Sequence, residues 1–245
     1  MYYFRYIKDS FFASKLEDLV STSNKKEFRD KANKLINYAI KKDNITIVYR
    51  LSIELDYLDY KATKLENYII KSGDSKYILK YAREIKTANI KKLERAIIDN
   101  NDVVRISIFG CFVRGANKEK IEDIIASSNN AKAAYYWVKF NRFANVNKVK
   151  HIIISSKRPR YLFAMARSQS RTHAHTRAYK EDFKLIQDLI IAGKSNLYIR
   201  MFAQLKGADI ARLERKIIDT GSKDEMLKFS RAVNSPKIMK LLLLF

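Results

Sequence analysis

A short phrase that recurs along the chain limits its fold more than any other feature. It reads Ala-Asn-Ile-Lys-Lys-Leu-Glu-Arg-Ala-Ile-Ile at 88–98 and Ala-Asp-Ile-Ala-Arg-Leu-Glu-Arg-Lys-Ile-Ile at 208–218. Weaker copies carry the same central apolar residue, which gives a series spaced by 30, 28, 28, 28, 37 and 27 residues: Leu35, Leu65, Leu93, Ile121, Val149, Ile186 and Leu213. Such a period is the signature of a repeat architecture, in which each unit buries its apolar face against its neighbours.

Each unit has room for two short helices and two turns. The first helix of a unit carries its apolar residues four positions apart, as in Leu93 and Ile97, and these lie on one face that we expect to be buried. An Asn or Asp precedes this helix and is expected to cap its free N–H groups, at Asn89, Asn117, Asn145, Asp182 and Asp209. Gly115 and Gly207 stand where the second helix should end.

The predicted fold class is all-α, a right-handed α-solenoid of stacked helical hairpins that is HEAT-like with repeats of roughly 28 residues. With 6 Gly and 2 Pro, the chain has few of the residues that a many-stranded β fold needs for its turns. We expect an N-terminal helical cap at 1–33, repeats at 34–233 with an insertion near 168–179, and a C-terminal capping helix at 234–245.

Positive charge dominates the surface and is unevenly placed. The formal net charge is +23, which attracts phosphate backbones or anionic lipid. From Ile124 to Lys180 there is no Asp or Glu, although twelve Lys and Arg lie there among Tyr, Trp and Phe side chains. We expect most of these aromatic side chains to be repeat core, and the long single-sign region to be the footprint of polyanion binding.

The spacing of 37 marks an insertion between Arg167 and Arg177, which we expect to be a loop that carries binding residues. The candidate nucleic-acid-binding residues are therefore Lys139, Arg142, Lys148, Lys150, Lys157, Arg158, Arg160, Arg167, Arg171, His173, His175, Arg177 and Lys180. A column of cations is also expected at the ends of the second helices, where the helix dipole alone would favour them, at Lys86, Arg114, Arg142 and Lys206.

The sequence predicts no cofactor, no metal site and no enzyme. His173 and His175 lack nearby carboxylates or thiolates that would complete a zinc site. A general acid–base role for either histidine in a metal-free ribonuclease remains an open alternative. The single cysteine, Cys111, excludes an internal disulfide and fits a reducing compartment. No export signal is evident, and the apolar run at 241–245 is too short to span a bilayer, so we expect a cytoplasmic protein without a membrane partner.

The repeated Asn/Asp-Ile-x-x-Leu-Glu-x-x-Ile-Ile units, each followed by a Gly- or Ser-containing turn and an aromatic second helix, resemble short helical-repeat proteins of tailed bacteriophage genomes. The resemblance covers residues 34–233 and implies a viral protein that acts in a bacterial cytoplasm, on host defence or on nucleic acid. Lys150 and Gln187 depart from the pattern, because they replace the repeat glutamate. The leading hypothesis is a non-enzymatic binder of DNA or RNA. The alternative is a protein-binding scaffold that inhibits an acidic host factor.

Overall fold

The computed structural model describes residues 10–172 and 177–244, and these residues form helices joined by turns, without a strand. The helices are α1 (Ser10–Val20), α2 (Lys25–Lys41), α3 (Ile45–Tyr57), α4 (Thr63–Lys71), α5 (Ser75–Glu84), α6 (Ile90–Asp99), α7 (Val103–Phe112), α8 (Lys118–Ser127), α9 (Ala131–Phe140), α10 (Val146–Ser155), α11 (Pro159–Thr172), α12 (Arg177–Ala192), α13 (Asn196–Ala203), α14 (Ile210–Ile218), α15 (Lys223–Val233) and α16 (Pro236–Leu242). The expected all-helical fold is confirmed.

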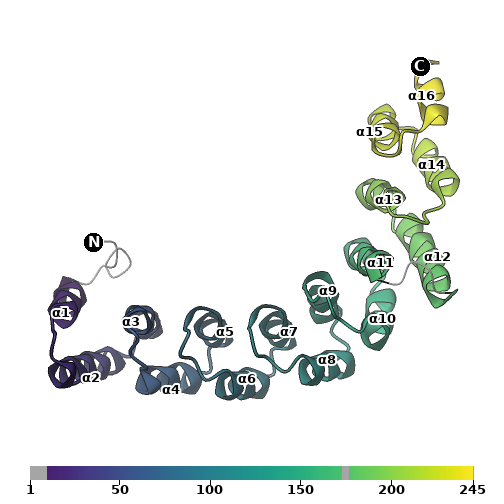
Figure 1. Ribbon diagram of the computed structural model, residues 1–245. Coiled ribbons are helices and arrows are strands. Elements are labelled where there is room, and N and C mark those ends of the chain that lie inside the picture. Colours follow the sequence, from purple (N-terminus) through teal and green to yellow (C-terminus); the bar gives the residue numbers. More distant parts are fainter. Residues whose placement is uncertain (1–9, 173–176, 245) are drawn as a thin grey trace. The chain divides into compact units, whose positions relative to one another are not determined.

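The chain divides into two compact units, Met1–Lys118 (unit 1) and Glu119–Phe245 (unit 2). Within each unit the helices lie in two layers (Figure 1). One layer, here called the first-helix layer, holds α4 and α6 in unit 1 and α10, α12 and α14 in unit 2. The second-helix layer holds α3, α5 and α7 in unit 1, and α9, α11, α13 and α15 in unit 2. Within each unit, every helix of this layer contacts the next helix of the same layer.

The core lies between the layers, where the repeat pattern predicts it. Leu35 retains 5% exposure, and the six equivalent residues have no exposed surface: Leu65, Leu93, Ile121, Val149, Ile186 and Leu213. Ile97, one helical turn beyond Leu93, is also completely buried. The apolar face of each first helix is therefore closed off from water, as the four-residue spacing predicts.

The turn between the two helices of each repeat has one residue with a left-handed backbone. These residues follow the seven buried apolar residues at a constant distance along the sequence: Asp43, Gly73, Asn101, Asn129, Lys157, Lys194 and Gly221, with φ from 49° to 67°. Gly, Asn and Asp tolerate this region, whereas a lysine there has a steric cost. The same local geometry thus recurs in every repeat. The conformational cost of the left-handed backbone is highest in the turns at Lys157 and Lys194, where lysine occupies that position.

The expected helix caps are confirmed in part. The side chains of Asn89 and Asp209 accept hydrogen bonds from the backbone N–H groups of Lys92 and Arg212. Asn145 lies at the cap position of α10 without a side-chain cap hydrogen bond. The prediction for Asp182 was wrong, because α12 begins upstream at Arg177 and leaves Asp182 inside the helix.

The glutamate of the repeated phrase joins one repeat to the next. The buried carboxylates of Glu66, Glu94 and Glu122 accept hydrogen bonds from the backbone N–H groups at the next cap position, those of Asn89, Asn117 and Asn145, at 2.8, 2.6 and 2.7 Å. Each carboxylate satisfies an N–H at the start of a helix, and that bond offsets part of the cost of burying the charge. We call these three side chains the linking carboxylates.

Two repeats that have another polar residue at the position of this glutamate use other contacts. Gln187 Oε1 accepts from the Asp209 backbone N–H at 3.0 Å, which preserves the bond with a neutral acceptor. Lys150 Nζ instead pairs with the Asp182 carboxylate at 3.1 Å. The linking interaction thus becomes an ion pair at the point where the repeat period lengthens to 37 residues.

The insertion lengthens two helices, so the expected loop was wrong for the described residues. Helices α11 and α12 have 14 and 16 residues, whereas α5, α6, α7, α8, α9 and α10 have 10 each. Arg167 lies within α11, and Pro159 is its first residue, where the missing N–H has little cost. A Cβ on Gly193, the residue after α12, would lie 2.8 Å from Pro159 Cγ, so a larger residue there would require the start of α11 to shift.

Candidate nucleic-acid interface

A groove of about 850 Å³ opens on the second-helix layer of unit 2, lined by residues of α9, α11 and α13 and of the turn after α9. Four cations line it: Lys139, Arg142, Arg160 and Arg167. Four aromatic side chains lie among them: Tyr135, Phe140, Phe163 and Tyr198. The groove therefore combines positive charge with aromatic surface, and no carboxylate belongs to its described lining.

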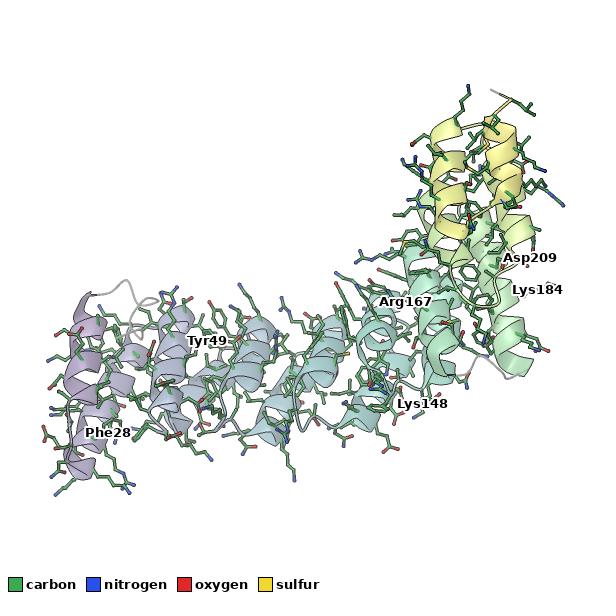
Figure 2. The ribbon with its side chains drawn as sticks, turned by 45° about the horizontal axis from the view of Figure 1, so that its top comes forward. Phe28, Tyr49, Lys148, Arg167, Lys184 and Asp209 are labelled. Carbon is green, nitrogen blue, oxygen red and sulfur yellow. The ribbon has the colours of Figure 1, made fainter. Side chains whose placement is uncertain are left out.

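The repeat places two of these cations at matching positions. Lys139 and Arg167 are one 28-residue period apart, so both lie on exposed surface of the second helix of their repeat. Arg142 follows α9 in the turn, and Arg160 occupies the first turn of α11. Figure 2 labels Arg167, which belongs to the second-helix layer, and Lys148, which belongs to α10 in the other layer. The groove residues thus share one face of unit 2.

Tyr135 connects the cations on the floor of the groove. Its hydroxyl accepts a hydrogen bond from Arg160 Nε at 3.0 Å, and the Arg160 guanidinium lies 5.1 Å from its ring centroid. Its ring stacks on that of Tyr161, with centroids 4.6 Å apart. Burial raises the pKa of Tyr135, but the hydrogen bonds and charges of Lys139 and Arg160 outweigh burial, so this pKa lies below its ordinary value. The floor of the groove thus favours negative charge.

Unit 1 has the opposite arrangement on its second-helix layer. The Tyr49 hydroxyl of α3 donates a hydrogen bond to the Glu84 carboxylate at the end of α5. Burial and then this carboxylate raise the pKa of Tyr49. A tyrosine that donates to a carboxylate does not favour a nearby anion, so the two units differ in electrostatics although both carry Tyr and Lys there.

The groove cations lack acidic partners within the described chain. In the acid-free segment, Lys148 pairs with Asp123 at 2.8 Å and Lys150 pairs with Asp182 at 3.1 Å. The other segment cations whose side chains are described have no carboxylate within salt-bridge distance: Lys132, Lys139, Arg142, Lys157, Arg158, Arg160, Arg167 and Lys180. Unpaired Lys and Arg at a concave surface are available to an external anion.

The structure divides the predicted binding residues into several groups. Lys139, Arg142, Arg160 and Arg167 meet in the groove. Lys148 and Lys150 lie on α10 and Lys180 on α12, both in the other layer, while Lys157 and Arg158 form the turn before α11. The side chains of Arg171, His173, His175 and Arg177 lie outside the described residues.

Cations occupy the expected positions after the second helices in both units. In unit 1, Lys86 and Arg114 are exposed and follow the ends of α5 and α7. In unit 2, Arg142 and Lys206 are exposed and follow the ends of α9 and α13. The left-handed turns that carry Arg114 and Lys206 contain Gly115 and Gly207, with φ of 87° and 92°, as the sequence predicts for glycines at helix ends.

The aromatic residues of the acid-free segment are mostly core, as expected. Tyr135, Trp137, Tyr161, Phe163 and Tyr179 are buried. Tyr136 is half-buried, and Phe140 and Phe143, at and beyond the end of α9, are exposed at 41% and 80%. Exposed aromatic surface in this segment therefore gathers around the Lys139 and Arg142 side of the groove.

Sequence reasoning missed the contribution of α13. Tyr198 and Met201 complete the groove, although both lie beyond the acid-free segment that directed the search. The available signal was the repeat itself, because the second helix of the next repeat should pack beside α11. The repeat pattern therefore predicts the place of α13 beside α11, and the structure adds that Tyr198 lines the groove.

The described part of the chain has no cluster of metal-ligating side chains and no activated thiol. No three His, Cys, Asp or Glu side chains there are grouped to hold a metal ion. Burial raises the pKa of the Cys111 thiol to about 12, which keeps it protonated and a poor nucleophile. Across residues 10–172 and 177–244, every helix is too short or too polar to cross a bilayer.

Comparisons of the chain with protein-family models, with curated proteins and with solved structures find no match.

Proposed function

We propose that this chain is a non-enzymatic nucleic-acid-binding repeat protein, and that the groove on unit 2 is its binding surface. The observation that carries the proposal is the meeting of four cations around an aromatic floor, with no carboxylate in the groove lining. Arg and Lys side chains that converge without acidic partners match the phosphates of a polyanion.

The aromatic floor favours nucleic acid over a simple anion. Inorganic phosphate or an acidic peptide would use the cations but not the rings. Nucleic acid uses both, because its phosphates pair with Lys and Arg while its bases stack on aromatic side chains. The positive charge of Lys139 and Arg160, which lowers the pKa of Tyr135 despite its burial, supports an anionic ligand at this floor.

The proposal includes an architecture and a setting. The constant turn geometry and the linking carboxylates support stacked hairpins of the HEAT-like α-solenoid type, with the right-handed arrangement that the sequence predicts. The resemblance to helical-repeat proteins of tailed bacteriophages extends the proposal to a viral protein that acts in the host cytoplasm.

A binding titration with matched charge removal tests this function. The groove variant carries Lys139→Gln, Arg142→Gln and Arg167→Gln, and the control variant carries Lys91→Gln, Lys92→Gln and Arg95→Gln on exposed positions of α6 in unit 1. Fluorescence anisotropy with labelled oligonucleotides is recorded over a range of salt concentrations. We expect the groove variant to bind more weakly, with a log–log salt slope smaller by about 0.7–0.9 for each lost phosphate contact.

The control decides between a site and a general attraction. Both variants lose the same formal charge, so an equal loss of affinity would show that net charge alone drives binding and would reject the groove. A wild-type protein that binds no oligonucleotide even at low salt would reject nucleic-acid binding altogether. In that case the alternative of a protein-binding scaffold gains support from capture of a stoichiometric protein complex.

A further inference from the structure

We infer that the groove on unit 2 takes single-stranded nucleic acid in preference to a duplex, with bases stacked on Phe140 and Tyr198 and phosphates on the cations between them. The inference rests on the proposed function and adds the strand state of the ligand. It follows from where the rings and the charges lie within the groove.

The groove is too small for a duplex to enter. Pockets of about 300–1,000 Å³ hold ligands of drug size, and this groove has about 850 Å³, which is room for a short stretch of nucleotides. It lies among three second helices that pack in sequence, α9, α11 and α13, and neighbouring packed helices are about 8–10 Å apart. A duplex could only rest on the rim, where it would leave the aromatic floor unused.

The rings are placed to receive base faces. Phe140 is 41% exposed, and its ring is held by stacking on Tyr136 of the preceding helical turn, with centroids 5.9 Å apart and planes at 14°. On the α13 side, Tyr198 is half-buried and packs against Phe163 at 6.2 Å. A duplex keeps its base faces stacked on one another, whereas a single strand can turn them onto protein rings.

On the α9 side, cations lie against the ring of the groove residue Phe140 and against that of Phe143, which follows it. Lys139 Nζ lies 4.8 Å from the Phe140 centroid, and the Arg142 guanidinium lies 5.8 Å from that of Phe143. Arg167 and Arg160 line the groove from α11, between the α9 and α13 sides. A base and its own phosphate are a few ångströms apart along a single strand, so alternating rings and cations suit that ligand.

Unit 1 offers a matched control for the stacking contact. Phe112 ends α7 one 28-residue period before Phe140, is 46% exposed, and has the Arg83 guanidinium 5.7 Å from its ring centroid. It therefore shares the exposure and the cation of Phe140 but belongs to the unit that carries Glu84. Substitution at Phe112 measures the effect of losing an exposed ring outside the groove.

The test measures anisotropy of a labelled single-stranded oligonucleotide and of the duplex of the same sequence, with wild-type protein, Phe140→Ala, Tyr198→Ala and the control Phe112→Ala. We expect tighter binding of the single strand. Each groove variant should weaken that binding by about 5–150-fold and leave duplex binding unchanged, while the control changes neither. Tyr198→Phe keeps the ring and should bind like the wild type, which separates stacking from a folding defect.

Three outcomes would overturn the inference. Duplex binding as tight as single-strand binding, with no effect of the ring substitutions, would leave general nucleic-acid binding standing and remove the preference for single strands. Competition by a mononucleotide as effective as that by a longer single strand would assign the groove to small nucleotides. A wild-type protein that binds neither the single strand nor the duplex would reject the proposed function, and the inference with it.

Discussion

Removal of the linking carboxylate Glu122 provides a sharp test of how the repeats are joined. Glu122 Oε1 accepts from the Asn145 backbone N–H and from Trp137 Nε1, both at 2.7 Å. Glu122→Ala leaves both donors without this acceptor. The Trp137 indole N–H is buried, so without its acceptor it should have the full cost of a buried unsatisfied group, about 1–3 kcal/mol.

The second donor should cost less. The Asn145 N–H is only partly buried, so water can replace the carboxylate and reduce the penalty. Together the two losses predict that Glu122→Ala lowers the free energy of unfolding by about 2–4 kcal/mol. Glu122→Gln retains an acceptor oxygen, as Gln187 does toward Asp209, and loses mainly the charge, so about 1 kcal/mol is expected.

Urea unfolding followed by circular dichroism measures the stability, and fluorescence reports the contact directly. Trp137 is the single tryptophan of the chain, so its emission should shift when its indole N–H loses the carboxylate. Glu119→Ala on the same helix removes an exposed carboxylate from its first turn and should lower stability by at most about 1 kcal/mol. If Glu122→Ala matches this control and the emission is unchanged, the linking carboxylates do not stabilise the repeats.

Four further measurements test the core, the turns, the caps and the groove. Leu93→Ala should lower the free energy of unfolding by about 2–5 kcal/mol in urea, because Leu93 is completely buried; a negligible change would contradict its core position. Lys157→Gly should raise the melting temperature, with a gain of about 0.5–1 kcal/mol, because glycine relieves a left-handed backbone at φ 51°; a fall would show that the lysine side chain stabilises this turn. Asp209→Ala should lose about 0.5–2 kcal/mol through its cap hydrogen bond, and equal stability would mean that the bond to Arg212 N–H has no net value. In an ultraviolet titration, Tyr135→Phe should remove a tyrosine that ionises at lower pH than an unperturbed one, because Lys139 and Arg160 lower its pKa; an unchanged curve would refute that shift.

The repeat could be derived from the sequence because its signal is local and redundant. Helical spacing sets which residues share a face, so the period of Leu65, Leu93 and Ile121 predicts the buried face before any partner is known. The caps at Asn89 and Asp209 depend on the first turn of one helix alone, and these too were predicted correctly.

The sequence predicted that the repeat between Val149 and Ile186 is longer than the others, but not whether the added residues extend the helices or form a loop. An insertion can extend a helix or form a loop, and the choice depends on the packing of the added turns. Here α11 and α12 continue, with Gly193 pressed against Pro159, and Asp182 becomes an internal partner of Lys150 instead of a cap.

Charge composition identified the region of the candidate interface but not its members. Lys139 and Lys148 are equally basic in the sequence, yet tertiary packing directs one into the groove and pairs the other with Asp123 in the opposite layer. Tyr198 joins the groove only because α13 packs beside α11. The sequence by itself determined the helices, their buried faces and the excess of positive charge, since these depend on local spacing and composition. Only the tertiary structure decided which cations remain unpaired and share a groove with aromatic rings, because that depends on contacts between helices far apart in the chain.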